Sequence, residues 1–298
     1  MAVTSAAHRA GHVAIVGRPN VGKSTLLNRM VGQKLSIVSR KPQTTRHPII
    51  GVVTRPDFQL VFVDTPGFQT RHGGLLNRSL NRAVTDSLAG VDAVLLVIEA
   101  LRYGEADAEL VRRLTPDVPV ILAINKIDRL TDKSLLLPFL ERLRHEYPFA
   151  EIVPVSGAAG TQCEALIEAL RQHLPEGTAM YDADALTDRS ERFLAAELVR
   201  EKVFRCTGEE LPHQCHVTVE RFETEGELRR IACTIVVART SQKGMVIGAG
   251  GERLKQIGTT ARQDMERLFG GRVWLDLHVR VEKDWMTDPG ALRRHGYL

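Results

Sequence analysis

Eight residues near the N-terminus have the types and spacing needed to hold a polyphosphate. They read Gly17-Arg18-Pro19-Asn20-Val21-Gly22-Lys23-Ser24 and fit the pattern G-x-x-x-x-G-K-[ST] of a phosphate-binding loop. The apolar stretch 13–16 before them is typical of a buried strand, and the stretch 25–30 after them, without glycine or proline, is typical of a helix. Backbone N–H groups at such a turn, together with the N-terminus of the helix, favour bound phosphate. The motif therefore predicts a nucleoside triphosphate site.

This loop and a second motif together predict a magnesium-assisted site. We expect Lys23 to reach the β- and γ-phosphates and the Ser24 hydroxyl to bind Mg²⁺. Asp64-Thr65-Pro66-Gly67 directly follows the strand-like stretch 60–63. Asp64 is expected to hold Mg²⁺ through a water molecule. The Gly67 N–H is expected to face the γ-phosphate, because only glycine lets the backbone come so close.

A third motif, Asn125-Lys126-Ile127-Asp128, predicts which base is bound. A carboxylate at Asp128 can accept hydrogen bonds from guanine N1–H and from the exocyclic amine. Adenine offers neither in that geometry and would leave a buried charge unmatched. We expect Lys126 to pack along the base and Asn125 to tie the loops together. Ser156-Gly157-Ala158, after the next strand-like stretch, would offer backbone N–H groups to guanine O6. The predicted base is guanine.

The elements around these motifs alternate between strands and helices. Strand-like stretches are expected at 49–54, 59–63, 93–98, 118–124 and 151–155, and helices at about 104–114, 134–147 and 161–174. The first two strands must pair antiparallel, because a parallel crossover needs a dozen or more residues. The alternation predicts an α/β fold with a mostly parallel sheet and helices on both faces. Ligands on such sheets bind at the carboxyl ends of the strands, where every motif falls.

The C-terminal part has a different pattern. An amphipathic helix is expected over about 193–204, followed by strands at 213–222 and 228–239, helical sequence through 269 and a last strand at 272–282. The order α-β-β-α-α-β is that of an α+β type II KH domain. Its G-x-x-G loop would be Gly248-Ala249-Gly250-Gly251, where single-stranded RNA backbone can approach helix N-termini. An apolar groove for bases is expected from Val246, Ile247, Leu254 and Ile257, edged by the charges of Lys243, Arg253 and Lys255.

Length and composition favour two domains. The 298 residues are about twice a typical domain, and we place the boundaries at 1–176, a linker at 177–188, and 189–298. The net charge of +4 requires any RNA site to be a local patch. No apolar run approaches the roughly 18 residues of a membrane span. We also expect no signal peptide, and the four cysteines lack C-x-x-C spacing, which fits reduced thiols in a cytosol.

From about Gly11 to its C-terminus the chain resembles the Era family of GTPases. The order of the motifs, the loop Gly17–Ser24 and the stretch Gln43-Thr44-Thr45-Arg46-His47 carry the resemblance. It implies that residues 1–176 form an Era-type GTPase domain that converts GTP to GDP and phosphate with Mg²⁺. It implies a switch threonine on Mg²⁺, Thr45 or else Thr44. At Gly157 the chain departs from the alanine that is usual in the family.

The resemblance also implies partners. These are the 3′ end of 16S rRNA and the 30S ribosomal subunit, whose assembly the family serves; no DNA partner is expected. The expected protein is a cytoplasmic monomer, with peripheral contact at the inner face of the cell membrane left open. Rival interpretations are a GTPase of tRNA modification or of membrane transport, which carry further helical or transmembrane domains. A third is an RNA-binding scaffold with a vestigial nucleotide site, and the intact Lys23, Ser24, Asp64 and Asp128 argue against it.

Two positions bear on hydrolysis. Ras-like GTPases place a water-orienting glutamine directly after D-x-x-G, where this chain has Phe68. A phenyl ring cannot position water, so a slow intrinsic rate is expected. Asn20 matches an asparagine with which related GTPases hold potassium, although an ordinary turn residue would explain it equally well.

The expected site residues fall into four groups. Those that bind GTP are Gly17, Arg18, Pro19, Asn20, Val21, Gly22, Lys23, Ser24, Thr25, Asp64, Thr65, Pro66, Gly67, Asn125, Lys126, Asp128, Ser156, Gly157 and Ala158. The catalytic ones are Lys23, Thr45 and Gly67, and the metal ligands are Ser24, Thr45 and Asp64 for Mg²⁺ and Asn20 for K⁺. Those that bind RNA are Lys243, Val246, Ile247, Gly248, Ala249, Gly250, Gly251, Arg253 and Lys255.

Overall fold

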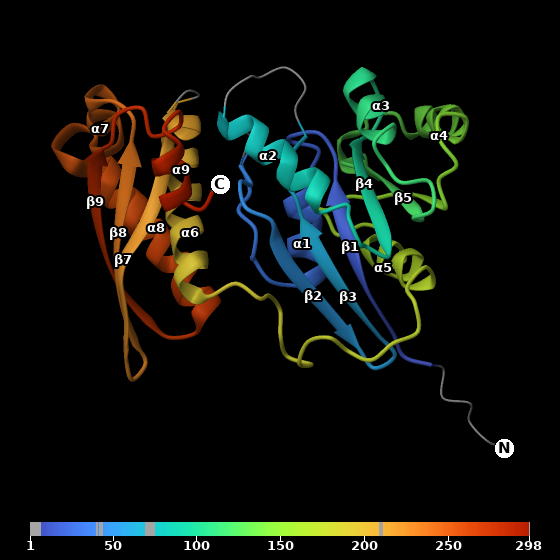
Figure 1. The fold of residues 1–298 in the computed structure, drawn as a ribbon, viewed down its shortest axis with the longest axis horizontal. Helices are drawn as coiled ribbons and strands as arrows, with labels where there is room; N and C mark the ends of the chain where they lie inside the picture. The colour runs from blue at the N-terminus through green and yellow to red at the C-terminus, as the bar shows by residue number, and fades with distance from the viewer. Residues whose placement is uncertain (1–6, 40, 42–43, 69–74, 209–210, 298) are drawn as a thin grey trace. The chain divides into compact units, whose positions relative to one another are not determined.

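A computed structural model describes residues 7–39, 41, 44–68, 75–208 and 211–297 (Figure 1). The contacts within the chain divide it into two compact units, and the main part of the second begins at Arg189. Two short groups of described residues in the N-terminal part, within 37–44 and within 75–79, cluster with the second unit.

The first unit is built on a six-stranded sheet in the order β2-β3-β1-β4-β5-β6. Its strands are β1 (Arg9–Val16), β2 (Ile49–Arg55), β3 (Phe58–Asp64), β4 (Ala93–Glu99), β5 (Val120–Asn125) and β6 (Glu151–Pro154). Only β2 and β3 pair antiparallel, joined by the turn Pro56-Asp57, and the remaining pairs are parallel. The predicted mostly parallel sheet and the predicted antiparallel pairing of these two strands are confirmed, and the pair lies at one edge of the sheet.

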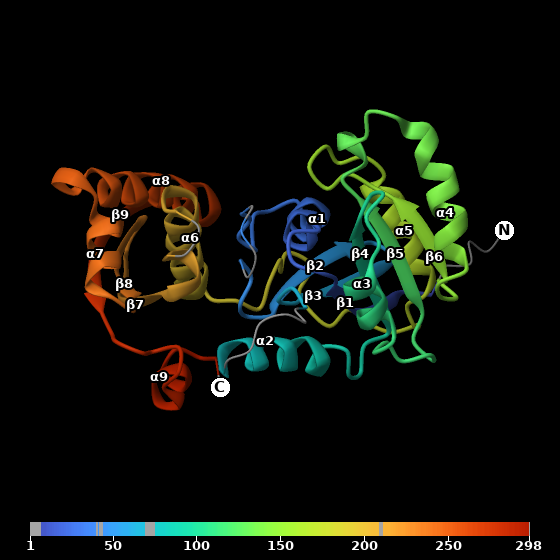
Figure 2. The ribbon, with the colours of Figure 1, turned by 90° about the horizontal axis from the view of Figure 1, so that it is seen from above.

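Helices cover both faces of this sheet (Figures 1 and 2). They are α1 (Lys23–Val31), α2 (Leu75–Asp86), α3 (Glu105–Val111), α4 (Leu136–Arg144) and α5 (Cys163–Gln172). Side chains of α2, α3 and α4 share one apolar cluster with β1, β4 and β5. Helices α1 and α5 pack against each other and against strands of the sheet. Helix α2 was not predicted, although its buried residues Leu76, Leu80 and Val84 recur every four positions, the period of a helix face.

The predicted linker, residues 177–188, lies along the first unit. The fully buried Gln59 of β3 accepts hydrogen bonds from the backbone N–H groups of Met180 and Tyr181, at 2.7 and 2.9 Å, and donates to the Tyr181 carbonyl at 2.9 Å. The Val52 N–H on β2 donates to the Leu186 carbonyl at 2.9 Å. The segment therefore has fixed partners on the sheet rather than spanning open solvent.

The second unit contains a three-stranded sheet in the order β7-β8-β9. Its elements are α6 (Glu191–Cys206), β7 (Cys215–Glu225), β8 (Leu228–Val237), α7 (Thr240–Ile247), α8 (Glu252–Phe269), β9 (Arg272–Val281) and α9 (Pro289–Arg294). Strands β7 and β8 are antiparallel, and β8 and β9 are parallel. The predicted order α-β-β-α-α-β is confirmed, and α9 extends it.

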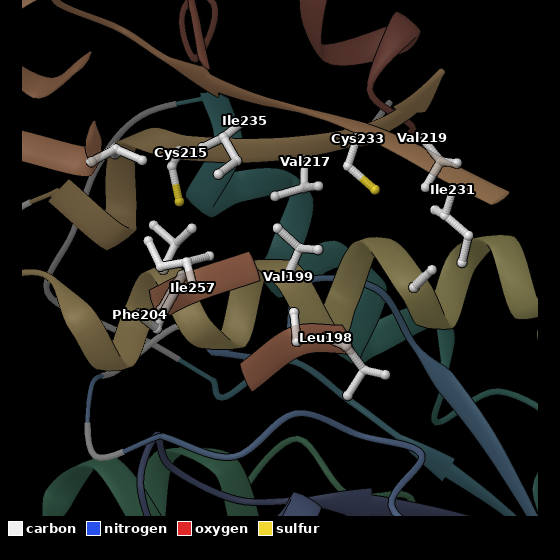
Figure 3. Close-up of a cluster of buried hydrophobic side chains, with 14 of the residues drawn as sticks. Leu198, Val199, Phe204, Cys215, Val217, Val219, Ile231, Cys233, Ile235 and Ile257 are labelled. Atoms are coloured by element: carbon white, nitrogen blue, oxygen red, sulfur yellow. The ribbon is translucent and has the colours of Figure 1, made fainter. Parts of the chain in front are cut away.

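One hydrophobic core holds this unit together (Figure 3). Leu198, Val199 and Phe204 of α6 and Ile257 of α8 face strand residues such as Val217, Cys233 and Ile235. The core residues of β7 and β8 occupy every second position, as expected for side chains on one face of a sheet, and the helices present an apolar stripe to them; they are Cys215, Val217, Val219, Ile231, Cys233, Ile235 and Val237. The core thereby fixes the start of α8, and with it the loop that precedes this helix.

Candidate functional site

The predicted phosphate-binding loop connects the end of β1 to the start of α1. Gly17 and Gly22 have φ values of 152° and 102°, which favour glycine. A Cβ atom at Gly17 would lie 2.4 Å from the Val97 carbonyl oxygen, and one at Gly22 would lie 2.2 Å from Asn125 Nδ2. The glycines are therefore required both by backbone conformation and by close neighbours.

Lys23 is buried inside this loop. Its Nζ donates hydrogen bonds to the carbonyl oxygens of Gly17 and Arg18, at 3.0 and 3.1 Å. Burial lowers the pKa of Lys23 to about 8, and the charge of Asp64 opposes this shift. The ammonium group is thus held by the loop at the place where the motif puts the β- and γ-phosphates. Arg18 points elsewhere, to the fully buried Asp107 of α3, with its Nε 2.6 Å from Oδ1.

The three residues predicted to hold Mg²⁺ come together. Ser24 Oγ donates to Asp64 Oδ2 at 2.8 Å and lies 2.9 Å from Thr45 Oγ1. Of the two candidate threonines, only Thr45 has this contact, because the Thr44 hydroxyl donates to the Lys41 carbonyl at 2.7 Å and lies 2.8 Å from Ser39 Oγ. Gln43 of the same motif lies outside the described residues.

The donor set fits a magnesium ion. Asp64 is fully buried, and within the described part of the chain its Oδ1 has no hydrogen-bond partner. Burial raises the pKa of Asp64, against the charge of Lys23 and the hydroxyl of Ser24. A buried carboxylate oxygen beside two hydroxyl oxygens offers the hard oxygen ligands that Mg²⁺ prefers.

Sequence reasoning missed Ser36, which supports this donor set. Its fully buried hydroxyl donates to Asp64 Oδ2 at 2.8 Å. Asn28 of α1 fixes Ser36 in turn, donating to its carbonyl at 2.6 Å and accepting from its N–H at 2.9 Å. A serine in a loop carries no motif signal, so only the fold brings it to the carboxylate.

The second motif packs directly against the first. A Cβ atom at Gly67 would lie 2.7 Å from Pro19 Cα, so glycine is required by the close approach of the two loops. Phe68 is buried among core residues of the sheet, and the Arg113 guanidinium lies 4.7 Å from its ring centroid. Its side chain is therefore a packing element. Thr65 Oγ1 donates to the Ile15 carbonyl at 2.8 Å, which ties this loop to β1.

The predicted guanine-binding loops are tied together by Asn125. Its Nδ2 donates to the Val21 carbonyl at 2.8 Å, and its Oδ1 accepts from the N–H groups of Lys126 and Gly157 at 2.8 and 3.0 Å. Ser156 Oγ donates to Asp128 Oδ1 at 2.6 Å and so orients the carboxylate. The phosphate loop and the two base loops thus share one side chain.

A further residue at this end of the sheet was not predicted. Glu99, the last residue of β4, has its Oε2 2.7 Å from Lys126 Nζ. Burial opposes ionisation of Glu99, but the neighbouring cations Lys126, Arg102 and Arg129 together outweigh it, so the pKa of Glu99 is lowered. Lys126 itself has a φ of 67°. The pair fixes the lysine stem beside the predicted base, and a glutamate at a strand end gives no such signal in sequence.

The predicted RNA-binding loop lies between α7 and α8. Gly248, Gly250 and Gly251 have φ values of 75°, 57° and 82°. Ala249 and Gly250 are exposed, and a Cβ atom at Gly250 would meet nothing within 4 Å. Arg253 Nη1 donates to the Met245 carbonyl across the loop. The loop is therefore an open backbone surface at the start of an 18-residue helix.

The apolar side chains next to this loop divide into two groups. Val246 and Ile257 are fully buried in the core, whereas Ile247 and Leu254 are partly exposed. Of the four groove residues expected from sequence, only Ile247 and Leu254 present apolar surface. Met245 is 53% exposed, and sequence reasoning did not include it. Lys255 is exposed and Lys243 half-buried.

In the described part of the chain, every helix is too short or too polar to cross a membrane.

Similarity to known proteins extends over nearly the whole chain. Residues 12–126 match a family model described as 50S ribosome-binding GTPase, and residues 210–286 match a KH domain model. The chain is 50% identical over 295 residues to GTPase Era of Nitrosomonas eutropha, which covers 99% of this chain and 100% of that protein. These similarities confirm the predicted GTPase and KH folds.

Two solved structures are similar over nearly the full length. One is a point variant of Aquifex aeolicus Era bound to GDP·AlF4⁻, and the other is Era in complex with MgGDPNP and nucleotides 1506–1542 of 16S ribosomal RNA. Each has a TM-score of 0.93 and 38% sequence identity, and covers 97% of this chain and 99% of that chain.

Proposed function

This chain belongs to the Era family of GTPases, and we propose that it binds the 3′ end of 16S rRNA through its KH domain and acts in assembly of the 30S ribosomal subunit. The observation that carries the proposal is the presence in one chain of a nucleotide site around Lys23 and a glycine loop, Gly248–Gly251, whose residues Ala249 and Gly250 are exposed. The similar Era structure that contains 16S ribosomal RNA nucleotides supports the choice of RNA. We further propose that the protein works as a cytoplasmic monomer, with any membrane contact peripheral.

We propose that the domains are residues 1–176, a linker at 177–188 and residues 189–298. The contact units support this division, because one unit runs to Asp188 and the main part of the other starts at Arg189. The hydrogen bonds of Met180, Tyr181 and Leu186 support a linker that stays with the GTPase domain. The freedom between the domains would then lie close to Arg189.

In the nucleotide site, residues of this chain bind and orient the phosphates. Lys23 neutralises charge on the β- and γ-phosphates, and the Gly67 N–H faces the γ-phosphate. Ser24, Thr45 and Asp64 would hold Mg²⁺, which would supply positive charge to stabilise the phosphates. Ser36 and Asn28 keep the Asp64 carboxylate in place. Asn125, Lys126, Asp128 and the loop Ser156–Ala158 hold guanine.

Hydrolysis by the isolated protein is expected to be faster in potassium than in sodium, because Asn20 lies in the phosphate loop where a cation could be held. We expect the rate of hydrolysis in potassium to be about tenfold that in sodium. This ratio corresponds to about 1.4 kcal/mol of transition-state stabilisation by the bound ion. Asn20→Gly tests the ligand cleanly, because glycine adopts the Asn20 φ of 65° without strain. Phosphate release measured in matched chloride salts would reject a potassium site if wild type and variant responded equally to the two ions.

The KH assignment is tested by Ala249→Asp combined with Gly250→Asp. Both positions are exposed, so the change should leave the fold intact. Side chains there obstruct the RNA backbone and the carboxylates repel it. RNA affinity should therefore fall on the order of 100-fold, the equivalent of two lost charge-assisted hydrogen bonds. GTP affinity should be unchanged, because the nucleotide residues lie in the other unit.

The matched control is Ala249→Asn with Gly250→Asn, which adds the same bulk without charge and tolerates the positive φ equally well. Fluorescence anisotropy with a 3′-terminal 16S rRNA oligonucleotide would give both affinities. We expect the asparagine pair to bind RNA more tightly than the aspartate pair. If the aspartate pair bound as tightly as wild type, the loop would not be an RNA site, and a protein-docking role would replace it.

A further inference from the structure

The loop that follows β6 is a closed turn with most of its backbone donors already used. Ser156 N–H donates to the Thr161 carbonyl at 3.0 Å, and Gly160 N–H donates to the Ser156 carbonyl at 2.7 Å. Gly157 N–H donates to Asn125 Oδ1 and Ala159 N–H to Ser156 Oγ, each at 3.0 Å. Among the described residues, the Ala158 N–H has no acceptor. It is therefore the donor that this loop retains for a ligand.

Arg29, on helix α1, holds the opposite side of the same loop. Its Nε donates to the Gly157 carbonyl at 3.2 Å, and its Nη2 donates to the Ala158 carbonyl at 2.7 Å. A Cβ atom at Gly160 would lie 3.6 Å from the guanidinium carbon, so the fork lies against the loop backbone. A planar guanidinium is suited to two neighbouring acceptors, because its donors are fixed relative to one another.

The rigidity of the peptide unit links these two observations. The Gly157 carbonyl and the Ala158 N–H belong to one peptide plane and point in opposite directions. Holding the carbonyl oxygen on Arg29 therefore directs the Ala158 N–H away from α1. Glycine at position 157 leaves this plane free to rotate unless something holds it. A Cβ there would lie 3.1 Å from Leu26 side-chain atoms, so an alanine at this position would be crowded.

We propose that Arg29 is a specificity-determining positioning residue, which orients the Ala158 N–H toward the O6 atom of guanine. The inference rests on the proposed use of this loop for guanine, and extends it to a residue outside the sequence motifs. Arg29 does not touch the base; it acts through the peptide plane between Gly157 and Ala158. Its effect should therefore depend on the atom at position 6 of the purine.

The test compares GDP with 6-thio-GDP in equilibrium binding to the full chain. 6-Thio-GDP keeps N1–H and the exocyclic amine, but replaces O6 with sulfur, a weak acceptor. Arg29→Met keeps the apolar stem and removes the donors. It should lower GDP affinity roughly fivefold, the value of one neutral hydrogen bond, and 6-thio-GDP affinity less than twofold. Arg29→Lys lacks the planar pair of donors that binds both carbonyls. It should therefore also lower GDP affinity more than 6-thio-GDP affinity.

Two further variants separate the possible failures. Arg144→Met removes another exposed arginine, paired with Glu141 on α4, and should leave both affinities unchanged. Asp128→Asn should weaken both ligands equally, because both carry the groups that the carboxylate accepts. If Asp128→Asn failed to weaken either, the proposed guanine site itself would be wrong. If that variant behaved as expected but Arg29→Met lowered both affinities equally, or neither, Arg29 would not orient the O6 donor.

Discussion

Replacing Asp128 by asparagine is expected to change the preferred base from guanine to xanthine. The carboxylate is oriented by Ser156 Oγ at 2.6 Å and can accept from both N1–H and the exocyclic amine of guanine. An asparagine amide turns one acceptor into a donor, which opposes the guanine amine but matches the C2 carbonyl of xanthine. A site built for a hydrogen bond discriminates strongly when the partner is lost, so GTP affinity should fall about 10³-fold.

Competition binding of GTP and XTP measures this change directly. Asp132→Asn is the matched control, because Asp132 is an exposed carboxylate that accepts hydrogen bonds from Ser134 in the following turn. That variant should keep the preference of wild type. A full GTP preference in Asp128→Asn would show that another group reads the base.

Lys23→Ala is expected to abolish tight GTP binding without unfolding the protein. The ammonium group is buried and held by two loop carbonyls, so it is ready for phosphate. Truncating one partner of a buried charge pair costs about 2–5 kcal/mol, which corresponds to a loss of roughly 30- to 4,000-fold in GTP affinity. In the protein without bound nucleotide, burial disfavours the charged form of Lys23. The variant should therefore have a melting temperature no lower than that of wild type.

Titration with a fluorescent GTP analogue and a thermal melt together test this prediction. Lys133→Ala, at an exposed position after Asp132, serves as the control and should leave both readings unchanged. GTP affinity within a few-fold of wild type in Lys23→Ala would contradict the assigned role of the lysine. A lower melting temperature with lost binding would instead indicate a structural role.

The nucleotide motifs could be predicted because their physical demands are local. Gly17 and Gly22 must be glycine for their own φ values, and a strand before and a helix after are visible in adjacent residues. The β2–β3 hairpin followed from the short turn between them. In the second unit, the order of elements was readable because each strand and helix keeps its own period of apolar residues.

Other features depend on contacts between distant segments, which one sequence does not reveal. Ser36 reaches Asp64 across 28 positions, and Arg29 reaches Gly157 across 128. The direction in which a side chain points also depends on the fold. Val246 and Ile257 suit an apolar groove by type, yet both point into the core because α7 and α8 pack against the sheet there. The short helix α9 depends on Asp288, whose carboxylate accepts from Gly290 and Ala291.

The most direct test of the proposed function is to sequence the RNA that crosslinks to this protein in cells. We expect the reads to gather at the 3′ end of 16S rRNA. We also expect Ala249→Asp with Gly250→Asp to remove this peak, while the asparagine pair retains more of it. The family model that matches residues 12–126 is described as a 50S ribosome-binding GTPase. Large-subunit RNA is therefore the alternative target that this experiment distinguishes from 16S rRNA. Reads gathered on large-subunit RNA or on tRNA, unchanged by the aspartate pair, would contradict the proposed function.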